Sequence, residues 1–497
     1  MNLKQLFGLL LLAACMSCED FGSVSTNPAY GLSFSADTLS FDTIFSDVGS
    51  ATRQLMVYNL HAEALRIESI ALANAGKSGF RINVDGRKGD TFYDVDLWKK
   101  DSLYVSVEVT LKPNGDVQPL LSEDSILFVT NGRRQSVLLQ ASGQDVRLLR
   151  GGVTWTGDTT LTSELPYLLY DSLLVAEGAT VTLAKGVAFH MHANASIIVA
   201  GTLRAEGTRE APVVFRGDRL DALHADVILP YDRIPGQWRG IVFTPSSFDN
   251  VLEHTIVRNA VNGLTFRPSD PARLKAVISH SQVTNMDGYL LEAVNCRIEA
   301  SNSEFTNATD AVLSLAGGSY RFVHCTMANY KRINGRDNRT PCVVLANVQR
   351  EGEVETRFPL RQAWFDNCII DGSHSADSTL LYRGELLFVT GEKEEPGGNE
   401  STFNYRFHSC FVKTARVENE RFAGNLFIYS PSYLKTGLKE EEYAYDFRLA
   451  NGSKGIGRAD PAIAAQYPED RYGVSRLTGE TVPSVGAYEY VYQEEAE

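Results

Sequence analysis

At 497 residues the chain is too long for one ordinary compact core, so we expect two or three domains, or one elongated repeat domain with additions. Apolar residues make up 43% of the sequence and charged residues 22%, which is typical of a folded protein and excludes extensive disorder. The net charge of -14 would repel phosphate backbones, which excludes nucleic acid as a partner.

The N-terminus has the pattern of an export signal. Lys4 precedes an apolar run over residues 6–12, and two alanines at 13 and 14 precede Cys15. This segment resembles a lipobox, at which bacterial lipoproteins are cleaved and acylated on cysteine. The resemblance implies that residues 1–14 are a signal peptide and that Cys15 carries the lipid, with Cys18 as the second candidate.

The apolar run at the N-terminus is shorter than the roughly 20 residues that a membrane-spanning helix needs, and no other segment of the sequence approaches that length. We therefore expect a protein held on the outer membrane by lipid, at the cell surface or facing the periplasm. Residues 15–30 are short, polar and rich in breakers, so they are expected to be a tether. A plain cleaved signal or an uncleaved anchor is the alternative.

Residues 31–145 alternate apolar and polar side chains in short runs that are separated by turn residues, as in 55–59, 65–70 and 103–109. This period-two pattern predicts a β-sandwich. The order of the runs, from 57–59 through 80–82 to 141–144, resembles the immunoglobulin-like domains of the Hydin type. The resemblance implies a spacer or docking module without chemistry of its own.

Residues 146–490 change to short strands divided by glycines, with no helical period between them, which predicts the coils of a solenoid. One template recurs: His or Asn, a small residue, any residue, an apolar residue, any residue, and Asn. Its starts lie 26, 22 and 22 residues apart, at His254, His280, Asn302 and His324. The phase returns at Asn367 and His408 after 43 and 41 residues, gaps that each hold two coils or one coil with an excursion loop.

Coils stacked about 4.8 Å apart would place equivalent positions on top of one another. The apolar position of the template would then stack inward as the core. The last position would form an amide ladder at a turn, where it would satisfy backbone groups that the bend leaves unpaired. The members of this predicted ladder are Asn259, Asn285, Asn307 and Asn329.

Two further stretches, residues 235–243 and the ending over 460–490, resemble bacterial right-handed parallel β-helix proteins of the pectate-lyase-like group. Together with the lipobox and the sandwich, they make the chain similar to a family of β-helix lipoproteins in Bacteroidetes. The resemblance implies an all-β fold with a right-handed parallel β-helix over 146–490, a surface address and no agreed activity. Residues 488–490 are expected to cap an open end of the β-helix, which favours a monomer.

The repeat region holds an odd number of cysteines without a CxxC pair, so we expect small buried residues and not a disulfide framework or a zinc site. They are Cys296, Cys325, Cys342, Cys368 and Cys410.

Catalytic candidates are few. Glycosidases of this fold need paired carboxylates beside the glycosidic bond, yet the chain contains no Asp-Asp pair and no Gly-His-Gly run. His190 and His192 lie two apart on a predicted strand, where both would point to one face and could share a metal. The histidines at 254, 280 and 324 would line one column, for which a stabilising ladder is the plainer interpretation.

Aromatic side chains offer a second kind of candidate, because sugar rings bind on flat aromatic faces. Six of them fall in or beside predicted coils, with core filling or capping of the solenoid's end as the alternative role: Trp238, Tyr289, Tyr320, Tyr330, Trp364 and Tyr405. Five Asp-Ser or Asp-Thr pairs that are followed by Leu or Ile, for example Asp101-Ser102-Leu103, also resemble an O-glycosylation sequon of this bacterial group, although such pairs open strands for ordinary turn reasons.

The function that we expect is a lipid-anchored, non-catalytic envelope protein that binds glycan or protein through its β-helix. One alternative is a polysaccharide lyase or glycoside hydrolase acting on an acidic polysaccharide, which would show acidic groups with an Arg or Lys in a groove across neighbouring coils. A purely structural envelope component is the other. We expect no cofactor and no metal site, and the residue pattern leaves Ca²⁺ open.

Overall fold

The computed structural model describes residues 23–221, 229–337, 339–352, 354–376, 384–391, 403–415, 419–427, 431–437, 444–477 and 482–494. The chain is all-β, with 51% strand and 2% helix, and divides into two compact units, Met1–Asp145 and Val146–Glu497. The candidate lipidation sites Cys15 and Cys18 lie outside the described residues. Within the described residues, no helix is long and apolar enough to cross a membrane.

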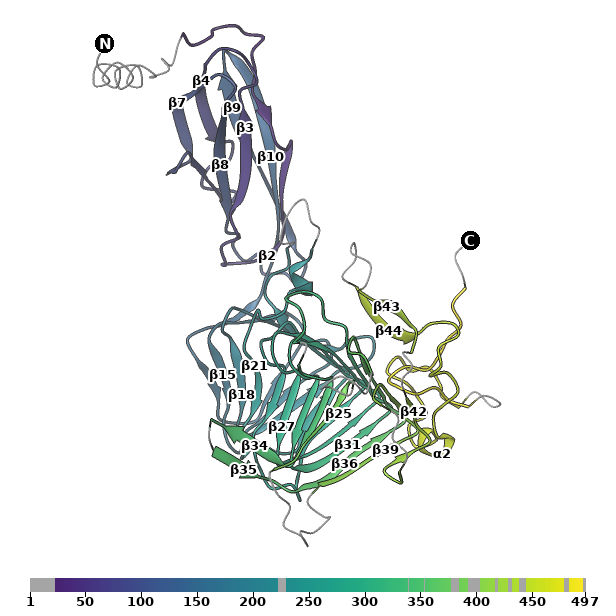
Figure 1. Ribbon diagram of the computed structural model, residues 1–497. Coiled ribbons are helices and arrows are strands. Elements are labelled where there is room, and N and C mark those ends of the chain that lie inside the picture. Colours follow the sequence, from purple (N-terminus) through teal and green to yellow (C-terminus); the bar gives the residue numbers. More distant parts are fainter. Residues whose placement is uncertain are drawn as a thin grey trace, which may run out of the picture. The chain divides into compact units, whose positions relative to one another are not determined.

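The first unit consists of two five-stranded sheets (Figure 1). One has the order β1 (Ser33–Phe34), β3 (Arg53–Tyr58), β8 (Ser102–Val109), β5 (Phe80–Val84), β6 (Arg87–Gly89). The other has the order β2 (Thr38–Phe45), β10 (Arg133–Gln144), β9 (Leu120–Thr130), β4 (Leu65–Leu72), β7 (Thr91–Leu97). Neighbouring strands are antiparallel except β2 and β10. Side chains alternate between buried and exposed along the strands, and one core joins both sheets through residues such as Val107 and Phe128.

The second unit is built on three long parallel sheets. The eleven-stranded sheet has the order β11 (Arg147–Leu149), β14 (Tyr167–Leu169), β17 (Ala188–Met191), β20 (Val213–Gly217), β23 (Thr255–Arg258), β26 (Gln282–Met286), β29 (Glu304–Ala308), β32 (Thr326–Asn329), β37 (Ile369–Gly372), β40 (Phe411–Val412), β42 (Leu426–Phe427). The nine-stranded sheet has the order β12 (Val153–Trp155), β15 (Ser172–Val175), β18 (Ser196–Val199), β21 (Gly240–Phe243), β24 (Leu264–Phe266), β27 (Leu291–Val294), β30 (Leu313–Ala316), β33 (Val343–Ala346), β38 (Leu386–Val389).

The ten-stranded sheet has the order β13 (Thr159–Leu161), β16 (Thr180–Leu183), β19 (Thr202–Glu206), β22 (Asn250–Glu253), β25 (Leu274–Ser279), β28 (Arg297–Ser301), β31 (Gly318–Val323), β36 (Leu360–Asp366), β39 (Phe403–His408), β41 (Phe422–Ala423). Successive strands of the chain join the three sheets in turn, so each circuit lays a new strand beside its equivalent in the previous one (Figure 1). This arrangement is compatible with the parallel β-helix that we predicted.

The recurring template marks the turn between the ten-stranded and the eleven-stranded sheet. Its first position has a left-handed backbone, with φ between 42° and 54°, at His254, His280, Asn302, His324 and Asn367. Asn and His tolerate this conformation better than most residues, which explains their recurrence there. In the last repeat Ser409 takes the position, with φ 49°, because His408 pairs with Asp366 inside the preceding sheet. Our alignment of His408 with this position was therefore wrong by one residue.

The gap of 43 residues after His324 holds one coil, because β37 lies directly beside β32. The additional length forms an excursion that includes an antiparallel hairpin of β34 (Val348–Glu351) and β35 (Val354–Arg357). The predicted burial of the cysteines is confirmed, since all five are buried and unpaired.

A C-terminal arm, which we define as the described residues from Tyr433 to Tyr490, covers the outer face of the eleven-stranded sheet. It contains β43 (Tyr433–Thr436), β44 (Tyr445–Leu449) and the short helix α2 (Pro461–Ala464). Ile370 belongs to the core inside the coils, whereas its neighbour Ile369 packs with arm residues such as Val485 on the opposite side. Tyr488 donates a hydrogen bond to Glu304 of β29 in mid-sheet, so it lies on a face and does not cap an end of the solenoid.

Candidate functional site

A ladder of polar side chains runs along the turn that the template marks. The rings of His254 and His280 stack with centroids 4.9 Å apart. The Asn302 amide nitrogen lies 3.3 Å from His280 Nε2, and in the next rungs the Asn367 amide nitrogen lies 3.0 Å from His324 Nε2. From His280 to Asn367 histidine and asparagine therefore alternate along the column, and His280 pairs with Asn302 and His324 with Asn367, as the ladder interpretation anticipated.

The arm fixes the orientation of both amides. Arg476 donates to Asn302 Oδ1 at 3.2 Å, and the Asp460 backbone N–H donates to Asn367 Oδ1 at 2.7 Å. Each amide therefore turns its NH₂ group to a histidine, whose Nε2 must accept. The proton of each ring then sits on Nδ1, and for His280 this nitrogen is buried without a hydrogen-bond partner among the described residues.

These imidazoles are held neutral. Burial, together with the neighbouring His254, Arg476 and Arg471, lowers the pKa of His280 to about 4. Burial beside Arg476 places the pKa of His324 well below its usual range. The pKa of His254 is also lowered, mainly by burial. At neutral pH the rings therefore offer lone pairs and N–H groups without a positive charge.

The arm covers the column from Asn302 to Asn367 and leaves its first two rungs beside a cavity. This cavity has a volume of about 420 Å³, and its lining comprises Thr208, Arg209, Glu210, His254, His280, Glu469, Asp470 and Gly473. Arg209 donates to the backbone oxygen of Tyr472 at 2.6 Å and so joins the two walls.

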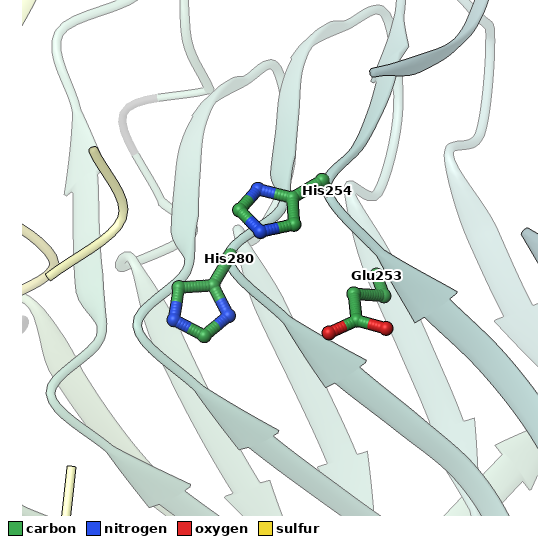
Figure 2. Close-up of side chains that lie close together, drawn as sticks. All are labelled: Glu253, His254 and His280. Atoms are coloured by element: carbon green, nitrogen blue, oxygen red, sulfur yellow. The ribbon is translucent and has the colours of Figure 1, made fainter. Parts of the chain in front are cut away.

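Three side chains of this region could hold a metal ion. Figure 2 shows that Glu253, His254 and His280 turn toward a common space, and their ligand atoms all lie within 4.8 Å of one another. The sequence analysis placed both histidines in one column but did not include Glu253. A glutamate directly before the ladder residue of one coil, with a histidine on the next rung, is the signal that would have identified the group.

The two histidines proposed from sequence as a metal pair have different surroundings. His190 lies in β17, buried beside Arg216, and burial lowers its pKa to about 3. His192 follows the strand, lies with its Nδ1 2.5 Å from Asp218, and stacks on Tyr170 at 4.0 Å. Among the described residues, neither ring belongs to a group of three or more side chains that could hold a metal ion.

The aromatic candidates are mostly part of the packing. Trp238 is 1% exposed and donates to the Arg258 carbonyl, so it fills the core. Tyr330 donates to buried Asp371 at 2.6 Å and packs against the arm. Trp364 is half-buried, and the Arg406 guanidinium lies 4.5 Å from its ring centroid, over one face. Tyr289 is half-buried.

Paired carboxylates with cationic partners do occur across neighbouring coils. Glu385 forms an ion pair with Arg336 and accepts hydrogen bonds from two backbone N–H groups, while Asp371 lies 3.6 Å from Lys413. Both carboxylates have 0% side-chain exposure, and burial raises the pKa of Asp371 to about 6. The sequence analysis missed this group because its members come from different strands and loops and form no short motif.

No family model matches the chain, and no curated protein does. Among solved structures, a Porphyromonas gingivalis protein of unknown function aligns with 27% of this chain and 60% of its own, at 13% identity and a TM-score of 0.18. A family 123 glycoside hydrolase from Clostridium perfringens aligns with 24% of this chain and 30% of its own, at 7% identity and a TM-score of 0.17. The catalytic unit of an α-1,3-glucanase from Streptomyces thermodiastaticus aligns with 71% of this chain and 90% of its own, at 8% identity and a TM-score of 0.13. TM-scores this low carry no argument about fold or function.

Proposed function

We propose that this protein is a lipid-anchored component of the bacterial cell envelope that binds glycan without cleaving it. In this proposal the second unit is a right-handed parallel β-helix, the first unit is an immunoglobulin-like spacer, and the lipid on Cys15 holds both at the outer membrane. The N-terminal segment supports the location at the outer membrane, and the recurring template supports the β-helix fold. The chemistry of the second unit supports the non-catalytic role.

The burial of Asp371 and Glu385 is the observation that carries the proposal. Hydrolysis requires carboxyl groups that reach both sides of a glycosidic bond, and elimination requires a base that reaches the sugar ring. Here both carboxylates have no exposed side-chain surface. Each is neutralised by a cation of the same protein, in the way that buried charges usually are. Such a group stabilises the coils and cannot contact a polymer in this conformation.

The cavity beside His254 offers a better contact for a sugar. Its lining includes guanidinium, carboxylate and imidazole groups that can bond to hydroxyls. The backbone oxygen of Tyr472 closes the wall with Arg209. Tyr472 is 42% exposed and lines an adjoining hollow with Arg448 and Val474, which shares Asp470 with the cavity. An exposed aromatic ring beside polar groups is the combination that sugar rings bind. A ligand of this type would contact both the coils and the arm.

The test is a glycan array combined with a turnover assay on acidic and neutral polysaccharides. We expect binding without release of reducing or unsaturated ends, and we expect Tyr472→Ala to weaken it at least tenfold. Tyr104→Ala, which removes a tyrosine of the first unit that is 52% exposed, is the matched control. Release of reducing or unsaturated ends by the wild type would establish the lyase or hydrolase alternative, and silence in both assays would favour the structural role.

The anchor has a separate test. Cells that express the chain are grown with an alkyne-labelled fatty acid, and the label is followed in Cys15→Ser and Cys18→Ser variants. We expect Cys15→Ser to lose the label and Cys18→Ser to retain it. Label retained in Cys15→Ser and lost in Cys18→Ser would move the anchor to the second candidate. A protein without label would leave only a cleaved or uncleaved signal peptide.

A further inference from the structure

We propose that Glu253, His254 and His280 form a binding site for a divalent transition-metal ion, for which Zn²⁺ is the probe. The site would be at the edge of the cavity already described, where the ladder emerges from beneath the arm. Metal binding here does not depend on glycan binding, and either can hold without the other.

The repeat geometry places these ligands together. Glu253 ends β22, His254 is the turn residue that follows, and His280 is the same turn residue one coil later. Successive coils therefore bring two imidazoles to one place with their centroids 4.9 Å apart. Stacking of parallel strands sets this spacing, which does not depend on a flexible loop.

The distances suit a site that closes on its ion. The ligand atoms lie within 4.8 Å of one another, whereas ligands bound to Zn²⁺ at about 2.1 Å in a tetrahedron lie roughly 3.4 Å apart. Glu253 is exposed, so its side chain can turn inward at little cost. Two neutral imidazoles and one carboxylate are a typical zinc donor set, and they leave one position for water or a further ligand.

The cavity supplies a further oxygen donor on the facing wall. Asp470 is already occupied, because its carboxylate accepts hydrogen bonds from the backbone N–H groups of Tyr472, Val474 and Glu489. Glu469 is exposed and lines the same cavity. It is therefore the group best placed to approach an ion from the arm.

The unpartnered nitrogen of His280 points to the same ligand. Its Nε2 faces Asn302, and its Nδ1 is buried without a hydrogen-bond partner among the described residues. A buried polar atom left unsatisfied destabilises the fold, and coordination of an ion would remove that destabilisation. To bind metal through Nδ1 the ring must move its proton to Nε2, and Asn302 must turn its oxygen to accept it. Arg476, which donates to that oxygen, opposes the turn.

This competition predicts an unusual gain of affinity. In Asn302→Asp the carboxylate can accept from Arg476 and from His280 Nε2 together, so the metal-binding tautomer is favoured without a rotation. Carboxylates that orient a metal-bound histidine typically change metal affinity about 10- to 100-fold. We expect Asn302→Asp to bind Zn²⁺ at least tenfold more tightly than the wild type. A ladder without a metal site would show no such gain.

The experiment is calorimetric titration of Zn²⁺ into the metal-stripped full chain that carries Cys15→Ser and Cys18→Ser, so that no tether thiol competes. Loss-of-function variants are His254→Asn and His280→Asn, because asparagine already occupies two rungs of the same ladder and fits the backbone. His192→Asn, a histidine paired elsewhere with Asp218, is the matched control. Co²⁺ substitution provides a second readout through its visible absorption.

We expect one ion per chain, at least tenfold weaker binding in His254→Asn and His280→Asn, and no change in His192→Asn. Circular dichroism in the presence of chelator verifies that each variant is folded. Absence of saturable binding to the folded wild type overturns the proposal, as does binding that both ladder variants retain. Glycan binding measured with and without chelator shows separately whether the ion serves the proposed function.

Discussion

The second position of the template forms a column of hydroxyl and thiol groups, each of which serves the coil before it. The Thr255 N–H donates to Ser281 Oγ at 2.9 Å, and the Ser281 N–H donates to Ser303 Oγ at 3.1 Å. Farther along, the Cys325 N–H donates to Cys368 Sγ at 3.4 Å, and the Cys368 N–H to Cys410 Sγ at 3.3 Å. The side chains at this position therefore satisfy turn N–H groups that the sheets leave unpaired.

Cys368→Ala tests this role. The variant removes the acceptor of the buried Cys325 N–H, so we expect the free energy of unfolding to fall by about 1–3 kcal/mol. Cys368→Ser keeps a small acceptor at the same place, and its loss should be smaller. Denaturant unfolding of both variants provides the comparison. Equal losses would mean that Cys368 contributes only by filling space.

His324 predicts a pH dependence of stability. Its folded pKa lies well below 6.5 because of burial and the facing Arg476, so below pH 6.5 the unfolded chain takes up a proton that the folded chain does not. Stability due to this group is full above pH 6.5 and falls with decreasing pH, by up to about 1.4 kcal/mol per unit, until the folded pKa is reached.

His324→Asn keeps the left-handed turn and removes the titrating ring. We expect the variant to lose less stability than the wild type between pH 7 and pH 5, as measured by urea unfolding at several pH values. Asp371 titrates in the opposite sense, because its folded pKa of about 6 exceeds the ordinary 3.8. Its contribution is common to both proteins and cancels. Parallel pH profiles would show that His324 does not control the acid response.

At this scale the sequence predicted the ladder well and the site poorly. The turn positions repeat along the chain, so one template identified His254, His280, Asn302 and His324 together. The final asparagines do bond to backbone groups, as Asn259 does to Asp232 and Ile234. The tautomers could not be predicted, because they depend on Arg476 and Asp460 of the arm.

Among the elements, the hairpin of β34 and β35 is an insertion into an otherwise ordinary coil. The Phe358 N–H donates to the Asn347 carbonyl at 2.8 Å, which closes the base of the excursion, and β35 is exposed along its length. The coil should therefore form without the hairpin, because β33 and β36 make their own ladders.

Replacing residues 348–357 with Asn-Gly tests this independence. Two residues suffice for a tight turn between paired strands, and among the described side chains of the hairpin only Val348 is buried. We expect the free energy of unfolding to fall by no more than about 1–2 kcal/mol. Leu345→Ala in β33, where the side chain is fully buried, should cost about 2–5 kcal/mol. Thermal unfolding of both variants shows which change costs more stability. A larger loss of stability in the hairpin deletion than in Leu345→Ala would contradict the prediction.

The coils were more predictable than the arm for a physical reason. Coil strands repeat at 22 to 26 residues over 254–324, so their pairing leaves a periodic pattern in the sequence. The arm occurs once, and its contacts depend on surfaces that exist only after the coils have stacked. For the same reason the sequence could not decide whether the 43-residue gap holds one coil or two. The direct pairing of β32 with β37 shows that it holds one.

On the scale of the whole molecule, the two units have separate hydrophobic cores. The cluster of the first unit runs from Leu32 to Ala141, and those of the second unit contain no residue before Leu149. Each core is built from strands of its own unit, so neither should need the other in order to fold.

Expression of Ser23–Asp145 and of Val146–Glu497 as separate proteins checks this independence. We expect each to unfold cooperatively, at a temperature within a few degrees of a transition of the intact chain. Calorimetry resolves the transitions. A fragment that unfolds without a cooperative transition would show that its core depends on the other unit.

The arm also has a consequence for how the chain reaches its final state. Its bonds join residues 93 apart for Asp460 and Asn367, 161 apart for Ala487 and Thr326, and 184 apart for Tyr488 and Glu304. Contacts so distant in sequence close more slowly than those between successive coils. A chain that is synthesised from its N-terminus would therefore complete its coils while the apolar surface around Ile369 and Phe411 is still exposed. During that interval the exposed apolar surface could associate with other molecules. Premature termination before the arm would yield coils that are prone to aggregation.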